Sequence, residues 1–304
     1  MRLKSNARCC ILAFIEQELP ATHDHGWTKL ANVSFILSTG RTSTQNIAAI
    51  AANAHPDAIV QHEGLGPNYF SRRVFRRPRK FAAALGGNIP LQRKFIEIED
   101  ALASGTPYLE VGWPAYAWLP YIADRFGSDF KFAHLVRNPF EVAASLTTHG
   151  LFADGIRRGN RFQRIAMIDV SDATVYHADI AANGSEFSPF ERNLFHWLEL
   201  NQFMLEQHGR DGFLGLFHFE DLYKASEPAL PALLGGLLGK AELDLVSAPV
   251  DRVQKKLPFK ISEPDPQLVH AVLNLAQRLG YSEEALLGSF SVDELNQRYS
   301  RLRL

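Results

Sequence analysis

The stretch from Val33 to Thr44 reads VSFILSTGRTST, a short apolar run followed by a turn of small and hydroxyl-bearing residues. The next residues, Asn46 to His55, read NIAAIAANAH and are rich in alanine, which favours a helix. Glycine and serine between an apolar run and a helical segment are typical of a loop. The stretch therefore predicts a strand, a tight loop and a helix, the unit from which parallel α/β sheets are built.

The same alternation of strand and helix patterns continues along the chain. Residues 130–136, FKFAHLV, are typical of a buried strand, and apolar residues from Leu91 to Leu102 recur at the spacing of one helical face. Parallel strands joined by helices predict an α/β fold, a three-layer sandwich with a central, mainly parallel sheet. Further strands are predicted at 58–60, 107–112 and 212–219, and further helices at 115–127, at 189–208, from about 227 and from 266.

The 304 residues are interpreted as a single domain, 1–304, because large α/β domains reach this length and 46% apolar residues can fill a substantial core. Between 150 and 188 no hydrophobic period is sustained, which predicts an irregular insertion. Residues 263–304 have a helical pattern and are interpreted as a C-terminal helical segment.

The N-terminal apolar stretch, Cys9 to Ile15, is interpreted as a first strand or a tail, because Glu16 and Glu18 end it at the lower limit of a signal peptide. Adjacent cysteines at Cys9 and Cys10 provide neither a disulfide framework nor a zinc site. No segment approaches the ~18 continuous apolar residues of a membrane span. We therefore expect a cytoplasmic protein without a membrane span.

The net charge of −1 excludes a globally basic surface for nucleic acid. The charge is nevertheless uneven, since residues 1–80 contain eleven basic against five acidic residues. An excess of positive charge in one part of the chain indicates a local site for an anionic ligand.

The loop from Ser38 to Thr44 has the composition of a phosphate-binding turn. A loop between a strand and a helix directs backbone N–H groups and the positive end of the helix dipole to one point. Gly40 gives the backbone freedom and Arg41 adds a permanent positive charge. Further donors are expected from Ser38, Thr39, Thr42, Ser43 and Thr44. An ordinary capped turn would have a similar composition, and the lysine and second glycine of a nucleoside-triphosphatase P-loop are absent.

A second motif, RNPFEVAAS from Arg137 to Ser145, directly follows the apolar run at 130–136. Arg137 is predicted at the carboxyl edge of the sheet, where open α/β sheets bind ligands. Pro139 suits a first helical turn, which puts Ser145 about two turns into the helix. Arg137 and Ser145 are therefore expected to converge on one phosphate.

Together the two stretches resemble the sulfotransferases that use 3′-phosphoadenosine 5′-phosphosulfate (PAPS). The family's phosphosulfate loop has a basic residue, Ser or Thr, Gly and two hydroxyl residues, and Arg41 to Thr44 match it except that Ser43 replaces the glycine. The family's 3′-phosphate motif is matched at Arg137, Asn138, Pro139, Glu141 and Ser145, and the segment from His218 to Gly239 is similar to a third family stretch.

The resemblance implies a P-loop nucleotide-kinase-like sulfotransferase architecture and transfer of a sulfuryl group from PAPS to a hydroxyl acceptor. The product would be adenosine 3′,5′-bisphosphate, and no metal is expected. The acceptor can be a carbohydrate, a tyrosine, a lipid or a small metabolite, and the oligomeric state is left open. The segment 150–188 is then expected to border the acceptor.

The loop after the second strand offers two candidates for the catalytic base, Glu63 first and His62 second. Arg41 stands where cytosolic family members have a catalytic lysine, and it is expected to steady negative charge without donating a proton. Lys255 and Lys256 are weaker candidates for the 3′-phosphate, because the Arg-Lys-Gly triplet of the family is missing there.

Two further features have competing interpretations. The run from Arg72 to Lys80, RRVFRRPRK, can steer PAPS or bind an anionic acceptor, but a solvated loop is slightly favoured. Trp113 and Trp118 can line an acceptor pocket or belong to the core. The alternatives for the whole protein are a nucleotide or small-molecule kinase with a degenerate P-loop and a non-catalytic nucleotide- or glycan-binding module.

Overall fold

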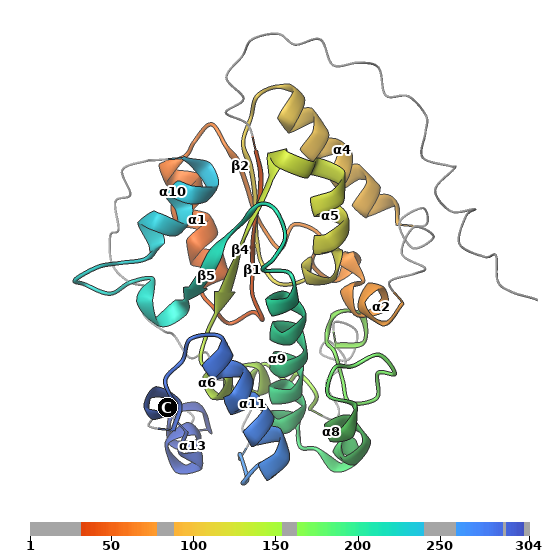
Figure 1. Cartoon of the computed structure of the whole chain (residues 1–304), viewed down its shortest axis with the longest axis vertical. Helices are drawn as coiled ribbons and strands as arrows, with labels where there is room; N and C mark the ends of the chain where they lie inside the picture. Colours follow the sequence, from red (N-terminus) through yellow and green to blue (C-terminus); the bar gives the residue numbers. More distant parts are fainter. Residues whose placement is uncertain (1–31, 78–87, 154–162, 240–259, 288–289, 301–304) are drawn as a thin grey trace, which may run out of the picture.

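The computed structural model describes residues 32–77, 88–153, 163–239, 260–287 and 290–300 (Figure 1). Its centre is a five-stranded, entirely parallel sheet with the strand order β2-β3-β1-β4-β5. The predicted α/β class with a central parallel sheet is thus confirmed. The strands are β1 (Val33–Leu37), β2 (Ile59–His62), β3 (Tyr108–Val111), β4 (Phe130–Val136) and β5 (Phe213–His218).

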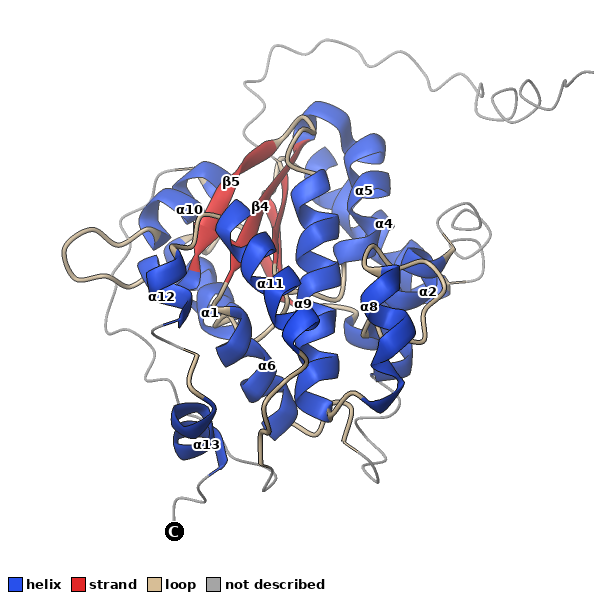
Figure 2. Cartoon of the chain, turned by 60° about the horizontal axis from the view of Figure 1, so that its bottom comes forward, coloured by secondary structure: helices blue, strands red, loops and turns tan. Residues whose placement is uncertain are grey.

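Helices cover both faces of this sheet, as a parallel sheet requires. On one face α1 (Thr44–Ala54) and α10 (Leu230–Leu238) pack on Ile36, Leu109 and Leu135. On the other face α4 (Ile89–Ala103), α5 (Leu119–Phe126) and α9 (Pro189–Glu206) pack on the alternate residues, among them Phe35 and Phe132. Figures 1 and 2 agree on these two sides, so the molecule has three layers.

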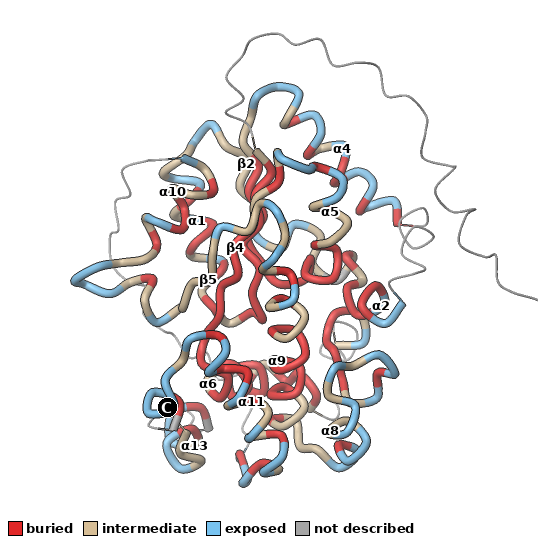
Figure 3. The backbone as a smooth tube through the Cα atoms, viewed as in Figure 1, coloured by how far each residue is buried: buried red, intermediate tan, exposed pale blue. Residues whose placement is uncertain are grey.

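Beyond the carboxyl end of the sheet lie α6 (Pro139–Thr148), which packs against α9, and α11 (Pro266–Arg278), which packs on the outer side of α9. Buried residues run through β1, β3 and β4, through α6 and along much of α9 (Figure 3). The remaining helices are α2 (Ser71–Arg76), α8 (Ala178–Asn183), α12 (Glu283–Leu287) and α13 (Val292–Ser300), with 3₁₀ turns at Gly66–Tyr69, Tyr116–Trp118, Gly127–Asp129, Gly184–Glu186 and Phe219–Asp221.

The strand order creates a switch point between β1 and β4. These strands are neighbours, but the chain leaves β1 toward β2 and leaves β4 toward β5 on the opposite side. The connecting helices also lie on opposite faces, since α1 belongs to one layer and α9 to the other. The loops after β1 and β4 therefore border the crevice where open α/β sheets bind ligands.

The structure differs from the sequence interpretation in three segments. The solvated loop favoured for the basic run is wrong for its described part, because Ser71–Arg76 forms α2 with Val74 and Phe75 buried. The helix predicted at 115–127 is a 3₁₀ turn followed by α5. Within 150–188 the described residues include the short helix α8, and six residues are too few to sustain a recognisable period.

Several sequence predictions lie outside the described residues, namely the stretch from Cys9 to Ile15, the end of the basic run at 78–80, and Lys255 and Lys256. Within the described part of the chain, no helix combines the length and apolarity that crossing a membrane requires.

Candidate active site

The loop between β1 and α1 is wound tightly. Gly40, Arg41 and Ser43 all have positive φ angles, of 79°, 60° and 62°. The Ser38 hydroxyl accepts a hydrogen bond from the Gly40 N–H at 3.1 Å and closes the turn. A non-glycine residue with positive φ costs on the order of 1 kcal/mol and persists where the surrounding structure enforces it. The loop is therefore a strained, specified conformation.

Gly40 cannot be replaced without displacing Trp113. A Cβ atom at this position would lie 2.9 Å from Trp113 Cδ1, besides being strained by the positive φ. Trp113 is buried, as is Trp118, whose Nε1 donates to the Tyr69 carbonyl at 2.6 Å. Both tryptophans therefore belong to the core, and Trp113 is also the floor on which the loop rests.

The same loop holds two buried hydroxyls that have no hydrogen-bond partner among the described residues, those of Thr39 and Thr42. A buried hydroxyl without a partner costs about 1–3 kcal/mol. Both side chains are fully buried, so this cost is not offset by bulk water. Unsatisfied donors on a tight strand-to-helix loop fit an anionic ligand that supplies the missing acceptors.

Direct hydrogen bonds join this loop to the second motif. Arg41 Nε donates to Ser145 Oγ at 2.8 Å, although the two residues are 104 positions apart. Arg137 Nη1 donates to the Arg41 carbonyl, also at 2.8 Å. The two stretches quoted for the family resemblance thus form one contiguous cluster at the switch point.

Arg137 is held from three directions. Its Nη2 forms an ion pair with Glu141 Oε2 at 2.6 Å, one turn further along α6, and its guanidinium lies over the Phe219 ring at 4.4 Å. Glu141 also pairs with Arg298 of α13. An arginine fixed on several sides loses little conformational freedom when it binds a planar or tetrahedral anion.

The third stretch contributes to the same cluster. Glu220 Oε1 accepts the N–H of Asn138 at 2.9 Å, and its Oε2 accepts the Tyr281 hydroxyl at 2.9 Å. Asn138 in turn caps α6 through its side chain, which accepts from the N–H groups of Phe140 and Glu141. Sequence reasoning missed Phe219 and Glu220 as parts of the site, although the similarity over His218 to Gly239 pointed to their segment.

The carboxyl end of β2 carries the two candidates for the base. His62 Nε2 lies 3.0 Å from the hydroxyl of Thr44, the first residue of α1, and 3.8 Å from Glu63 Oε1. Glu63 has a φ of 49°. A Cβ atom on Gly112 would lie 2.5 Å from Glu63 Cγ, so glycine at 112 makes room for this side chain.

The surroundings of Glu63 shift its acidity. Burial and the nearby carboxylate of Glu110 raise the pKa of Glu63 to about 7, and the Arg41 guanidinium opposes this rise. Burial lowers the pKa of His62 below its ordinary value. A carboxylate that titrates near neutral pH is a far stronger base than an ordinary glutamate, so Glu63 has the basicity that proton abstraction requires.

Glu110 is a buried carboxyl beneath this loop that sequence reasoning missed. Its Oε1 accepts the N–H of Gly64 at 2.7 Å and its Oε2 accepts the Tyr108 hydroxyl at 2.7 Å. Burial raises the pKa of Glu110, and its hydrogen bonds and Lys94 act against that rise. Glu110 thereby fixes the backbone next to Glu63. A lone glutamate in a short strand carries no sequence signal for this role.

The structure brings most of the predicted site residues together. Arg137 and Ser145 lie beside the loop and the start of α1, which carry Ser38, Thr39, Gly40, Arg41, Thr42, Ser43 and Thr44. His62 and Glu63 follow β2, which β3 separates from β1, but their side chains reach this cluster, since His62 Nε2 contacts the Thr44 hydroxyl and Arg41 acts on Glu63. Among the residues that the structure describes, no group of three or more His, Cys, Asp and Glu side chains is arranged to hold a metal ion.

The fold and site thus define a parallel α/β protein with a cluster of arginine and hydroxyl side chains at its switch point. No family model and no curated protein sequence matches the chain. Among solved structures, it is similar to a sulfotransferase domain from the curacin biosynthetic pathway, at 15% identity and a TM-score of 0.42, over 83% of this chain and 98% of that one. It is also similar to the sulfotransferase domain of the Synechococcus PCC 7002 olefin synthase, at 17% identity and a TM-score of 0.45, over 83% of this chain and 96% of that one.

Proposed function

We propose that the protein is a PAPS-dependent sulfotransferase that transfers a sulfuryl group to a hydroxyl acceptor and releases adenosine 3′,5′-bisphosphate. The observation that carries the proposal is the junction of the two motifs, where Arg41 Nε bonds Ser145 Oγ and Arg137 Nη1 bonds the Arg41 carbonyl. One strand-to-helix loop and one Arg–Ser pair, side by side, suit a nucleotide with phosphates at both its 5′ and its 3′ position.

The residues divide between the two ends of this nucleotide. The phosphosulfate end suits the loop, where Thr39 and Thr42 hold hydroxyls that have no other partner in the described chain. The 3′-phosphate suits Arg137 and Ser145, and Ser145 Oγ then exchanges its bond with Arg41 for one with the phosphate. That exchange frees the Arg41 guanidinium to turn toward the phosphosulfate.

When bound, PAPS supplies an activated sulfuryl group with a phosphate as its leaving group. Glu63 takes the proton of the acceptor hydroxyl, because a pKa raised to about 7 makes its carboxylate a stronger base. The carboxylate form that can accept the proton predominates only above that pH. Arg41 neutralises the negative charge that develops on the departing phosphate oxygen. His62 is the second candidate for the base, placed between Thr44 and Glu63. The remaining contribution of the protein is to hold the acceptor in line.

Calorimetric titration with adenosine 3′,5′-bisphosphate, 5′-AMP and ATP tests the cosubstrate. We expect the bisphosphate to bind at least tenfold more tightly than 5′-AMP, because only the bisphosphate engages Arg137 and Ser145, and one charge-assisted bidentate contact is worth about 1.5–3 kcal/mol. Arg137→Ala should abolish this preference, and because Arg137 Nη1 also holds the Arg41 carbonyl, the readout is the ratio of the two affinities.

The matched control is Arg93→Ala, an exposed arginine on α4. Equal affinities for the bisphosphate and 5′-AMP in the wild-type protein would reject the sulfotransferase assignment. Tighter binding of ATP than of the bisphosphate would favour a kinase. Binding of the bisphosphate without transfer from labelled PAPS to any carbohydrate, tyrosine, lipid alcohol or small hydroxyl metabolite would favour a non-catalytic module.

A further inference from the structure

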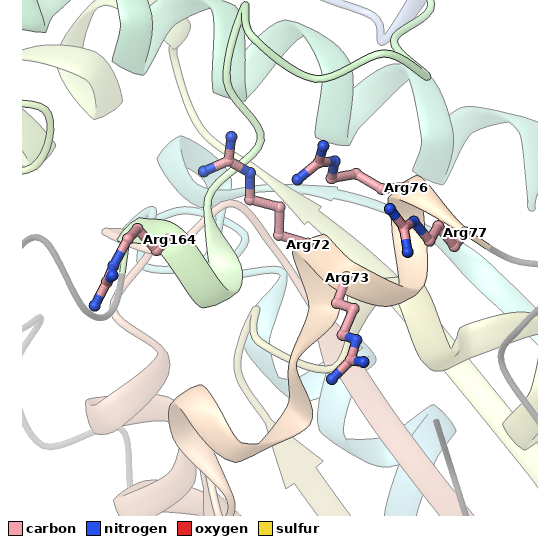
Figure 4. A pocket seen from close by; sticks show the side chains of 5 residues that line it. All are labelled: Arg72, Arg73, Arg76, Arg77 and Arg164. Carbon is pink, nitrogen blue, oxygen red and sulfur yellow. The ribbon is translucent and has the colours of Figure 1, made fainter. Parts of the chain in front are cut away.

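A pocket with a volume of about 290 Å³ is lined by five arginines, Arg72, Arg73, Arg76, Arg77 and Arg164 (Figure 4). Four of them come from α2 and the residue that follows it, and the fifth comes from a helical turn at 163–166. The segments lie about ninety residues apart in the chain and meet only in the fold. The sequence alone favours a solvated loop for the first segment and places Arg164 in an irregular stretch.

Two of the arginines are held in place by buried aspartates. Arg72 Nε lies 2.9 Å and Arg76 Nε lies 3.0 Å from the carboxylate of Asp172, whose side chain is fully buried. Arg72 Nη2 also donates to Ser171 Oγ at 3.2 Å and lies 3.9 Å from Asp169. In Figure 4 the side chains of Arg72 and Arg76 extend in the same direction from α2. Because Arg76 is held through its Nε, its Nη atoms keep donors for a ligand, whereas Nη2 of Arg72 is already bonded to Ser171.

The other arginines of α2 are not neutralised in this way. Arg73 and Arg77 are exposed, and neither guanidinium forms an ion pair within the described part of the chain. Arg73 and Arg77 thus add two positive charges to the pocket that are not paired with a carboxylate of the described residues. Like charges gathered at one pocket repel one another, and an anion in the pocket relieves that repulsion.

A row of packed aromatic side chains connects the helix of the arginine pocket to the proposed phosphosulfate loop. Phe75 of α2 packs against Tyr116 with ring centroids 6.2 Å apart, and Tyr116 stacks on Trp113 at 6.5 Å. Trp113 is the residue that a Cβ atom on Gly40 would strike. The end of β2 also leads directly into this region, since α2 follows Glu63 after a single 3₁₀ turn.

We propose that the arginine pocket binds an oxyanion group of the acceptor, so that the substrate is a hydroxyl compound that also carries a carboxylate, phosphate or sulfate. The assignment of the ligand as acceptor rests on the proposed function, whereas the anion site itself does not. Guanidinium groups match these planar and tetrahedral anions with paired hydrogen bonds. A volume of about 290 Å³ is at the lower end for ligand pockets and accommodates one charged end of a molecule.

Inorganic pyrophosphate is the probe, because it presents paired oxyanions without a nucleotide. We expect calorimetry to detect binding that weakens as salt is added. The double charge reversal Arg73→Glu and Arg77→Glu should weaken pyrophosphate binding at least tenfold, and Arg137→Ala should leave most of it intact. Arg73→Gln with Arg77→Gln is a milder second variant, and Arg93→Glu controls for the change in net charge. Thermal unfolding checks that each variant is folded.

The same proteins are titrated with adenosine 3′,5′-bisphosphate, which separates the two proposals. Retained bisphosphate affinity together with lost pyrophosphate affinity in the pocket variants supports a distinct anion site for the acceptor. Pyrophosphate binding that is absent from the wild type, or that disappears in Arg137→Ala and persists in the pocket variants, overturns the inference. Failure of the wild type to bind the bisphosphate removes the sulfotransferase proposal, and with it the acceptor assignment, but not the anion site.

Discussion

Glu63 combines two unusual properties in one residue, a left-handed backbone with a φ of 49° and a pKa raised to about 7. The bond from the Gly64 N–H to buried Glu110 holds the backbone turn at the end of β2. Burial is the main cause of the raised pKa of Glu63, and the charge of Glu110 adds to it. Strain and perturbed acidity at one position are expected where a side chain has to be presented to a substrate.

This acidity predicts the pH dependence of the reaction. If Glu63 is the base, kcat/KM for sulfuryl transfer should rise with pH and reach half of its plateau near pH 7, because the carboxyl must first lose its proton. Glu110→Gln removes a negative charge that raises the pKa of Glu63, so the rising limb should move to lower pH. Rates of transfer from labelled PAPS, measured from pH 5 to 9, test this expectation.

Glu97→Gln is the matched control, since this partly exposed carboxylate is not among the groups that shift Glu63. Replacing Glu63 and His62 separately by alanine tests the order of the two candidates. Transfer that survives in Glu63→Ala and is lost in His62→Ala would make His62 the base. A pH–rate curve whose rising part is not shifted in Glu110→Gln would contradict an electrostatic effect of Glu110 on Glu63.

At the scale of elements, the loop between β1 and α1 stores strain that a glycine would release. Ser43 is the N-cap residue of α1, but its φ is 62° and its side chain makes no capping hydrogen bond. We therefore expect Ser43→Gly to stabilise the fold by up to about 1 kcal/mol, the left-handed penalty of serine less the greater chain entropy of unfolded glycine. Urea denaturation at constant pH measures the difference.

Ser188 of α9 is the contrasting control, because it is also an N-cap but has a φ of −60° and a complete capping box with Glu191. Ser188→Gly should destabilise the protein by between a few tenths and about 1 kcal/mol. Equal effects of the two substitutions would show that strain at Ser43 is not what distinguishes them.

The strands and helices were accessible from the sequence because their signals are local. The apolar runs that became β1 and β4, and the alanine-rich segment that became α1, are readable within one window of residues. The loop and the Arg137 motif were accessible for the same reason. Their direct contact additionally requires β1 and β4 to be neighbours, which follows from the parallel sheet only when the strand order is known.

The partners of these residues could not be predicted from the sequence, because they come from distant positions with no pattern of their own. The Asn138 N–H bonds to Glu220, 82 positions away, and Arg72 bonds to Asp172, 100 positions away. The second pair also explains why α2 is a helix despite its arginines, since buried aspartates take up two of the positive charges and let Phe75 pack inward. A charge run predicts a solvated segment only where no such countercharge is folded against it.

At the scale of the whole molecule, two histidines are buried without charge in the core. His134 of β4 is bonded to Asn201 of α9 at 2.8 Å and to His208 at 3.0 Å, and His196 of α9 accepts the Ile168 N–H at 3.0 Å. Burial lowers the pKa of both imidazoles to about 3. The folded protein therefore does not take up protons at these sites where the unfolded chain does.

This difference predicts how stability depends on pH. Below the unfolded pKa of ~6.5, each buried histidine should reduce the free energy of unfolding by about 1.4 kcal/mol per pH unit, until the folded pKa is reached. The raised pKa of Glu63 has the opposite effect on stability between its unfolded and folded pKa values, so the slope of stability against pH contains both contributions.

Comparing the wild type with His196→Gln isolates the contribution of one histidine, because the glutamine amide can still accept the Ile168 N–H. The stability of the wild type relative to this variant should fall by about 1.4 kcal/mol per pH unit between pH 6 and 4. Urea denaturation at each pH gives both curves, and His270→Gln, at an exposed position on α11, is the control. Curves for His196→Gln and the wild type that run parallel over this range would contradict a neutral, buried His196.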